Sequence, residues 1–459
     1  MTPSDLNQPE HKIRGETEQG IKSIAVFSIE GESASAVLRI LGPARHLGWK
    51  VIHGFDKGVF HFEAVKQADV VVLQRDFCRE VTAYTQIITV ARSLHKPVIL
   101  DLDDLFFELP EAHHCRVRGF YTDALLPIYL ALIDADLVTV STAPLRETLL
   151  PYNPNIRVIS NYLEDALWKL KDPQPPAADP GKIVIGYMGT ESHRPDLQTI
   201  LPALLELEHK YPGRIAYRFW GMEPPAELAT RSQVEWPSKL TTKYADFVEY
   251  FQSQSADIVI SPLADNLFNA CKSAIKYLEY TAIGIAGVYS RVAPYQDIIR
   301  EGEDGLLASS AEEWVSALSA LIESPELRAR LITNAQANIA ENWMLSKNVY
   351  KHREIYEQAL AGYQGRTRSV PPHLDLIRNI AAQHYELQQR LLHEDSYSRG
   401  QLSDKDTLLH DLRQEKADLL NRIDALNDEV VAYANSPSWK ITRPFRKNSW
   451  RCRRRPGAR

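Results

Sequence analysis

Two lysines and a glutamate in the second half of the chain form the group of residues best suited to chemistry. Lys272, Lys276 and Glu279 are separated by four and three residues, with Ile275 and Leu278 between them. On a helix this spacing places the three charged side chains on one face and the apolar ones on another. Two cations and a carboxylate near a helix start suit an anionic ligand, because the free backbone N–H groups there add partial positive charge. The alternative is a solvated face with an ordinary ion pair.

The elements that must position this group follow a regular pattern. The helical segment comes after a short apolar run at residues 257–261, which is typical of a buried strand. Apolar runs alternate with helical periodicity in residues 21–165, and the alternation restarts in residues 183–345 after a proline-rich linker at 166–182. This alternation implies parallel sheets with helices on both faces. We therefore predict an α/β chain with two Rossmann-like doubly wound domains, and a ligand cleft between the carboxyl ends of their strands.

The segments that flank the two domains have a different composition. Residues 1–20 are polar and are predicted to be a disordered leader without a signal-peptide core. A helix at 346–364 is expected to pack back across the domains. Residues 374–435 are predicted to be helical or coiled coil. The evidence is a seam with one polar break whose members step by three and four, namely Leu409, Leu412, Lys416, Leu419, Ile423, Leu426, Val430 and Tyr433. This coiled coil could join copies of the chain, or the helix could fold onto its own domain.

The last segment, residues 436–459, is basic and contains aromatic side chains. It carries nine Lys and Arg and no acidic residue, with Trp439, Phe445 and Trp450 interleaved. Such a segment suits an anionic membrane surface. Nucleic-acid binding is physically allowed as well, and a disordered solubilising tail is the third interpretation. We expect the membrane surface rather than nucleic acid as the partner.

The overall composition bounds the class of protein. With 459 residues, 44% of them apolar and 24% charged, the chain is typical of a soluble globular protein of more than one domain. Its net charge of −6 gives no global sign of nucleic-acid binding. Four cysteines without paired spacing indicate neither a zinc site nor a disulfide framework. No apolar run reaches the length of a membrane span. We expect a cytoplasmic protein, held at the inner face of the membrane by its tail.

Three segments of the second domain resemble the donor domain of GT-B glycosyltransferases, in particular the retaining enzymes that build bacterial surface polysaccharides. They are Ile185–Leu197, Asp257–Tyr280 and Pro294–Leu307. In the first domain, Ser35–Gly48 is similar to the helix that follows the first strand in those enzymes, so the resemblance covers about residues 21–360. It implies a GT-B fold and transfer of a sugar from a nucleotide-sugar donor to a glycan or lipid-linked acceptor. It further implies retention, with no metal and no other cofactor.

The same resemblance assigns roles on the donor side. In that family two glutamates with seven residues between them mark the donor helix, and the second holds the ribose hydroxyls. Glu279 matches the second, whereas Cys271 stands where the first is expected. Lys272 lies where a cation can meet the donor diphosphate, and His193 could contact phosphate or sugar or be structural. The catalytic residues are thus expected to be Lys272, Glu279 and His193. The other donor-side residues that we predict are Gly189, Thr190, Asn269, Ser273 and Lys276.

The acceptor is expected on the first domain. The residues that we predict on that side are Gly31, Ser33, Arg39, Asp103 and Asp104. The acidic run that starts at Asp101 could instead bind Mg²⁺ or supply a nucleophile, and it resembles the first motif of haloacid-dehalogenase-like phosphatases. Against this, three strand candidates precede the run, and Leu105 stands where those enzymes prefer Thr or Val. A GT-B-shaped interaction protein that has lost catalysis is the other alternative, and Cys271 favours it.

Overall fold

The structure is a computed structural model in which the chain forms two compact units, residues 1–381 and residues 382–459. It describes residues 20–29, 31–173, 182–230, 233–237, 241, 243–363, 414, 417–422 and 424–425. In the second unit the described residues are helical. The leader, the basic tail and most of the predicted coiled coil lie outside the described residues, so those predictions stay predictions. The first unit contains two separate six-stranded sheets.

A parallel sheet in the order β2-β1-β5-β6-β7-β8 forms the centre of the first domain. Its strands are β1 (Ser23–Phe27), β2 (Lys50–His53), β5 (Val70–Gln74), β6 (Val98–Leu102), β7 (Leu137–Val140) and β8 (Ile156–Val158). A small hairpin of β3 (Phe55–Asp56) and β4 (Val59–Phe60) follows β2. Strands β5 and β6 are buried along their whole length, which is why each begins with an apolar run, Val70–Leu73 and Val98–Leu100.

Helices cover both faces of this sheet. Ile24 and Val26 of β1 belong to one buried cluster, whereas Ala25 and Phe27 belong to another, as expected when successive side chains point to opposite faces. The helical segments of this domain are α1 (Ala34–Ala36), η1 (Val37–Leu41), α2 (Gly42–Leu47), α3 (Glu63–Gln67), α4 (Val81–Ser93), η2 (Phe106–Glu108), α5 (His114–Val117), α6 (Thr122–Asp134) and α7 (Ala143–Leu149).

The second domain repeats the arrangement with a parallel sheet in the order β11-β10-β9-β12-β13-β14. Its strands are β9 (Ile183–Gly189), β10 (Ile215–Gly221), β11 (Gln233–Glu235), β12 (Ile258–Ser261), β13 (Gly287–Ser290) and β14 (Leu306–Ala308). Its helical segments are η3 (Glu191–His193), α8 (Arg194–Lys210), α9 (Ala226–Ala229), α10 (Tyr244–Gln252), α11 (Leu267–Ala270), α12 (Ile275–Ala282), α13 (Ala293–Gln296), α14 (Ala311–Glu323) and α15 (Pro325–Asn342). The prediction of two Rossmann-like α/β domains is confirmed.

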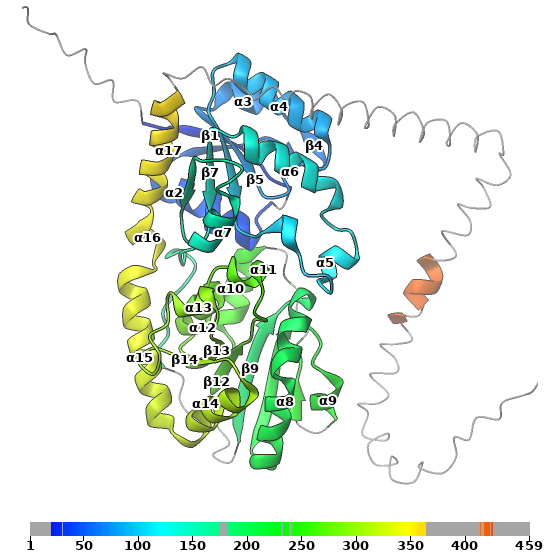
Figure 1. Ribbon diagram of the computed structural model, residues 1–459, viewed down its shortest axis with the longest axis vertical. Coiled ribbons are helices and arrows are strands. Elements are labelled where there is room, and N and C mark those ends of the chain that lie inside the picture. Colours follow the sequence, from blue (N-terminus) through cyan, green and yellow to red (C-terminus); the bar gives the residue numbers. More distant parts are fainter. Residues whose placement is uncertain are drawn as a thin grey trace, which may run out of the picture. The chain divides into compact units, whose positions relative to one another are not determined.

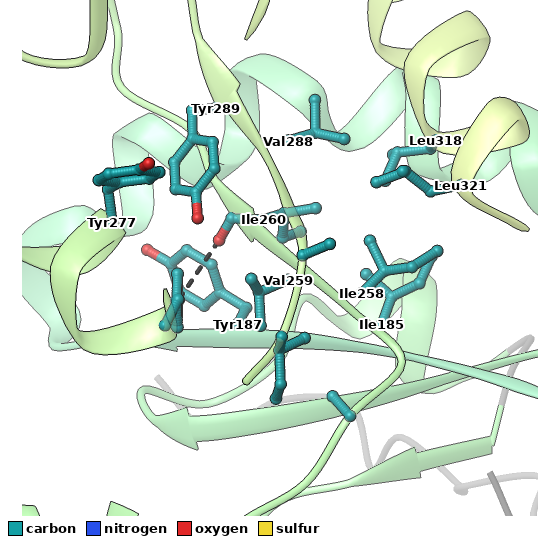
Figure 2. Packing of buried hydrophobic residues seen from close by; sticks show 14 of the residues in the cluster. Ile185, Tyr187, Ile258, Val259, Ile260, Tyr277, Val288, Tyr289, Leu318 and Leu321 are labelled. Carbon is teal, nitrogen blue, oxygen red and sulfur yellow. Dashed lines mark hydrogen bonds between the residues drawn. The ribbon is translucent and has the colours of Figure 1, made fainter. Parts of the chain in front are cut away.

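The core of the second domain joins its central strands to helices on either side. Figure 2 shows Leu318 and Leu321 of α14 near the side chain of Val288 on β13. On the other side, the rings of Tyr277 from α12 and Tyr289 from β13 meet edge to face, with their centroids 5.5 Å apart. Helix α12 is therefore packed firmly against the sheet, and this packing sets the position from which its other side chains project.

Two further helices, α16 (Leu345–Asn348) and α17 (Tyr350–Tyr363), follow the second domain. Tyr356 of α17 is buried in the same cluster as Ile24 and Val26 of the first domain, and its ring centroid lies 5.3 Å from that of Trp49. Figure 1 shows α17 beside the first domain, although the chain has by then passed through the second. A helix from beyond the second sheet thus completes the core of the first domain.

The segment that carries Lys272 is not the single helix of about a dozen residues that the sequence predicts. It forms α11 and α12, with residues 271–274 between them. The Cys271 carbonyl accepts a hydrogen bond from Thr142 Oγ1 of the first domain at 2.8 Å. That carbonyl would have accepted the N–H four residues later in a continuous helix. Lys272 therefore precedes the first turn of α12, and its expected place on one helix face with Lys276 and Glu279 is wrong.

Candidate functional site

The carboxyl ends of the two sheets border a cleft of about 440 Å³. The polar residues that line it from the first domain are Ser33, Ser35, Arg75, Asp103, Asp104 and Asn161. The polar residues that line it from the second domain are Thr190, His193, Thr241, Lys243, Tyr244, Lys272, Ser273, Lys276, Glu279 and Tyr295. Ligands of doubly wound folds bind outside the carboxyl ends of the strands, so this cleft is the candidate site. It brings together most of the residues predicted on the donor and acceptor sides.

Lys276 supplies an unusual charge to this cleft. Its side chain is 8% exposed, and its ammonium has no hydrogen-bond partner among the described residues. The ammonium lies 5.3 Å from the centroid of the Tyr187 ring. Burial lowers the pKa of Lys276 to about 8, and the nearby Lys272 lowers it as well, while Asp196 and Glu279 oppose the change. A buried cation without a partner is costly, so the arrangement suits an anionic ligand.

Glu279 lies one turn beyond Lys276 on α12 and is also buried. Its Oε1 accepts a hydrogen bond from the Tyr244 hydroxyl at 2.9 Å. Burial raises the pKa of Glu279 to about 7, although the Tyr244 hydrogen bond and the charge of Lys276 act in the other direction. The carboxylate form therefore predominates above neutral pH. In that form the group can accept hydrogen bonds from hydroxyls of a ligand.

Lys272 connects the two sides of the cleft. Its ammonium lies 3.4 Å from Asp104 Oδ1 of the first domain and 4.3 Å from the centroid of the Phe268 ring. Burial alone would raise the pKa of Asp104, but Lys272 and Arg75 together hold it below its ordinary value. Asp104 is therefore ionised at neutral pH. A second polar contact crosses the cleft beside this pair, where Ser273 Oγ accepts from Asn161 Nδ2 at 2.9 Å.

His193 is held by a carboxylate. Its Nδ1 lies 2.9 Å from Asp196 Oδ2. Burial lowers the pKa of His193 to about 4 and Lys276 adds to this, while the hydrogen bond to Asp196 opposes it. The imidazole is thus neutral at pH 7, with its hydrogen on Nδ1 toward the carboxylate, and Nε2 is left as a hydrogen-bond acceptor. Asp196 stands three residues after His193, a spacing that could have indicated the pair.

Four of the predicted site residues do not line the cleft. Asn269 is buried, and its Nδ2 donates to Asp196 Oδ1 at 2.7 Å, so it supports the residue that holds His193. Gly189 ends β9 at a place where a Cβ would lie 2.7 Å from the Tyr187 hydroxyl, so its role is in packing. Gly31 is exposed in a turn with φ +59°. Arg39 is 1% exposed and lies in the core of the first domain.

Arg39 also binds the carboxylate of Asp101. Its Nε and Nη2 donate to the two oxygens of Asp101 at 3.1 and 2.7 Å, and Thr139 Oγ1 donates to Asp101 Oδ2 at 2.7 Å. Arg39 therefore does not support the predicted contact with an acceptor. Asp101, which is 2% exposed, is equally unsuited to bind Mg²⁺ or act as a nucleophile. This buried network argues against the phosphatase hypothesis.

Cys271 also lies away from the cleft lining. It is fully buried, its Sγ lies 3.8 Å from Thr148 Oγ1, and it belongs with Phe268 to a core cluster of the first domain. The residue at this position packs against the neighbouring domain and does not face a ligand in the cleft. The replacement of a carboxylate by cysteine here therefore gives no support to the hypothesis of a non-catalytic scaffold.

Comparison with known proteins agrees with this geometry. Residues 199–360 match a family described as glycosyl transferase-like. The structure is similar to sucrose-phosphate synthase from Thermosynechococcus elongatus, with a TM-score of 0.52 and 14% identity over 74% of this chain and 100% of that one. The Anabaena protein HepE in complex with UDP-glucose gives a TM-score of 0.51 and 13% identity over 74% and 100% of the two chains. The chain has the GT-B fold of these structures, and its second domain contains the segment that matches the glycosyl transferase-like family.

A third solved structure has the same fold. The catalytic domain of starch synthase IV from Arabidopsis thaliana, bound to ADP and acarbose, gives a TM-score of 0.51 and 11% identity over 75% of this chain and 100% of that one. No curated protein sequence matches this chain. In the part of the chain that the structure describes, no helix combines the length and apolar character needed to cross a membrane.

Sequence reasoning missed several residues of the cleft. Arg75 follows β5 directly, with a left-handed φ of 52°, and its Nε lies 3.4 Å from Asp103 Oδ1. Its place at the end of an apolar run was a usable signal, because the carboxyl ends of central strands meet at the cleft. Tyr244 and Phe247 come from α10, and nothing in the local sequence distinguishes them from core aromatics.

One group of side chains among the described residues could hold a metal ion by the spacing of its atoms. It consists of His46, Glu164 and Asp165, none of which lines the cleft. These side chains are engaged within the protein, since His46 Nε2 lies 2.6 Å from Glu164 Oε1 and both Asp165 oxygens accept hydrogen bonds from Ser346. These contacts connect the segment after β8, which carries Glu164 and Asp165, to His46 on α2 and to Ser346 on α16.

Proposed function

We propose that the protein is a glycosyltransferase that uses this cleft to transfer a sugar from a nucleotide-sugar donor to a glycan or lipid-linked acceptor. The observation that carries the proposal is the buried ammonium of Lys276, which has no hydrogen-bond partner among the described residues and lines the cleft with Lys272 and Glu279. An anion at this place would compensate two cations at once. Lys276 lies in the first turn of α12, and the helix start adds partial positive charge at the same place.

On the donor side, Lys272 and Lys276 would bind the diphosphate, and Glu279 would accept hydrogen bonds from the ribose hydroxyls. Thr190 and Ser273 line the same part of the cleft and offer hydroxyl groups. Two proteins of the same fold support a nucleotide as the ligand class, since HepE was solved with UDP-glucose and starch synthase IV with ADP. The choice of sugar and base is left open by this argument.

The proposed reaction needs stabilisation of a leaving group. The bond between the sugar C1 and the diphosphate breaks and the nucleotide keeps the electron pair. The acceptor hydroxyl forms the new bond to C1, and its proton passes to the released diphosphate. The two lysines and the helix start would stabilise the growing negative charge without a metal. Neutral His193 would accept a hydrogen bond from a sugar hydroxyl. Retention of configuration belongs to the proposal and rests on the family resemblance.

The acceptor would bind against the first domain. Ser33, Asp103, Asp104 and Arg75 line that side of the cleft. Carboxylates beside an arginine suit the hydroxyl groups of a glycan, since both kinds of group exchange hydrogen bonds with hydroxyls.

We include cell-surface polysaccharide biosynthesis in the proposal, with the basic tail at an anionic membrane surface. Co-sedimentation with phosphatidylglycerol vesicles that weakens with salt would support the tail's role, and equal binding to neutral phosphatidylcholine would contradict it.

The proposal is tested by turnover. Purified full-length protein is incubated with UDP-, GDP- and ADP-sugars, and nucleotide release and sugar transfer to oligosaccharide acceptors are measured, with the anomeric configuration of any product determined by NMR. We expect release from one class of donor and an axial or equatorial linkage that matches the donor. Absence of binding and turnover with every donor would contradict the proposal. An inverted linkage would remove only the claim of retention.

A further inference from the structure

Helix α10 begins where the two domains meet. Its first residue, Tyr244, is 3% exposed, and its backbone N–H donates to the Glu32 carbonyl of the first domain at 3.0 Å. The preceding residue adds a second contact, since the Lys243 ammonium lies 2.9 Å from the Glu32 carboxylate. Glu32 lies in the loop after β1, which borders the cleft through Ser33. The start of α10 is thus fixed to the first domain although α10 belongs to the second.

The hydroxyl of Tyr244 is the centre of a buried chain of hydrogen bonds. It accepts from Trp168 Nε1 at 3.0 Å and donates to Glu279 Oε1 at 2.9 Å. Trp168 is 1% exposed and belongs to the segment that links β8 to β9, so it comes from neither sheet. An indole N–H can only donate, and this fixes the direction of the chain. The phenol hydrogen must therefore point at the Glu279 carboxylate.

This geometry constrains the carboxylate that faces the donor. One oxygen of Glu279 is held by the phenol, so the plane of the carboxylate is set before a ligand arrives. Hydrogen bonds in a chain polarise one another, and at low local dielectric each is stronger than in water. The titratable groups close to this chain of hydrogen bonds are Lys276 and Tyr280 on α12, Tyr295 on α13, Tyr244 itself and Glu164 in the segment after β8.

We propose that Tyr244 is a positioning residue of the donor site, whose hydroxyl orients Glu279 toward the hydroxyls of the nucleotide, and that Trp168 makes this orientation depend on the inter-domain linker. The inference rests on the proposed function for the identity of the ligand. It goes beyond that function because it assigns part of the donor affinity to Tyr244, which acts through Glu279, and to Trp168 in the inter-domain linker.

The test uses Tyr244→Phe, which keeps the ring and removes only the hydroxyl. We expect whichever of UDP, GDP and ADP the wild type binds to bind roughly tenfold or more weakly at pH 7, since a hydrogen bond to a charged group is lost. Loss of the phenol hydrogen bond should raise the pKa of Glu279 further, so the pH at which binding is half lost should move upward, and the deficit should shrink at pH 9. Tyr250→Phe is the matched control and should behave as the wild type, since Tyr250 lies on the same helix but is not part of the Trp168–Tyr244–Glu279 hydrogen bonds.

Trp168→Phe should move the same pH midpoint in the same direction by a smaller amount. If the wild type binds a nucleotide and Tyr244→Phe has the same affinity and pH midpoint, the inference is overturned while the proposed function stands. If the wild type binds none of UDP, GDP and ADP, the proposed function fails, and the role of Tyr244 in donor binding fails with it. In that case ¹³C NMR titration of the Glu279 carboxyl, assigned with Glu279→Gln, still decides whether the phenol acts on Glu279, since an unchanged pKa in Tyr244→Phe would exclude it.

Discussion

The Lys272 ammonium of the second domain lies 3.4 Å from the Asp104 carboxylate of the first. Asp104 also lies 3.9 Å from Arg75 Nη2, so one carboxylate stands between two cations at the mouth of the cleft. A diphosphate that binds at Lys272 has to share that ammonium with Asp104. The contact therefore couples the binding of a donor anion to the relative position of the two domains.

Asp104→Asn should strengthen the binding of a nucleoside diphosphate several-fold at low salt. The change removes a negative charge near the site and frees Lys272, and a partly exposed pair of this kind contributes about 1 kcal/mol or less. Isothermal titration calorimetry at two ionic strengths checks it, with the gain shrinking at high salt. Glu111→Gln, an exposed carboxylate on the same loop, is the control. Weaker binding by Asp104→Asn would mean that Asp104 assists the ligand.

Lys276→Met should separate stability from binding. Methionine fills a similar volume without placing an unpaired charge in a buried site, so we expect the free energy of unfolding to rise by about 1 kcal/mol. Nucleoside diphosphate affinity should fall at least tenfold, since a charge-assisted contact to phosphate is lost. Urea unfolding and calorimetry measure the two effects. Lys347→Met, at an exposed position of α16, should change neither. A Lys276→Met protein that is less stable and binds normally would assign Lys276 to the fold.

The pH dependence of stability should also reveal Lys276. Its pKa in the folded protein is about 8, below its ordinary value, so between about pH 8 and 10.5 the unfolded chain binds more protons at this residue. Stability of the wild type relative to Lys276→Met should therefore rise with pH across that window and be constant below it. Urea unfolding of both proteins at pH 7, 9 and 10 measures the difference. A difference that stays flat would show that the ammonium is not desolvated.

Asp101→Asn should damage the fold. It breaks a buried, doubly hydrogen-bonded pair with Arg39, and removing one partner of such a pair costs about 3–5 kcal/mol. Thermal unfolding measures the loss, and Asp56→Asn, at an exposed position of the β3–β4 hairpin, is the control. A variant of normal stability that loses an Mg²⁺-dependent phosphate release found in the wild type would revive the phosphatase hypothesis.

The sequence was informative where a residue's role depends on its near neighbours. Buried strands such as β5 and β12 could be recognised as apolar runs, because strands covered on both faces carry few polar residues. Lys276 and Glu279 were placed correctly in one cleft because they share a helix and a spacing of three. The order of the elements then indicated which strand ends would meet.

Roles that depend on contacts between distant segments could not be predicted. Tyr244 and Glu279 are 35 residues apart, and Asp104 and Lys272 are 168 apart, so no local pattern links either pair. The break before α12 has the same origin, since the hydroxyl of Thr142 in the other domain takes the carbonyl of Cys271. Arg39 was misjudged because its partner, Asp101, lies on β6, 62 residues away in the sequence.

The central claim is that the cleft binds a nucleotide through Lys272 and Lys276. It is tested most directly by calorimetric titration of UDP, GDP and ADP into the full-length protein and its Lys272→Ala variant. The account predicts that the wild type binds one of these nucleotides, and that Lys272→Ala keeps the wild-type unfolding temperature while losing at least tenfold in affinity. Binding of equal strength by both proteins, or by neither, would contradict it.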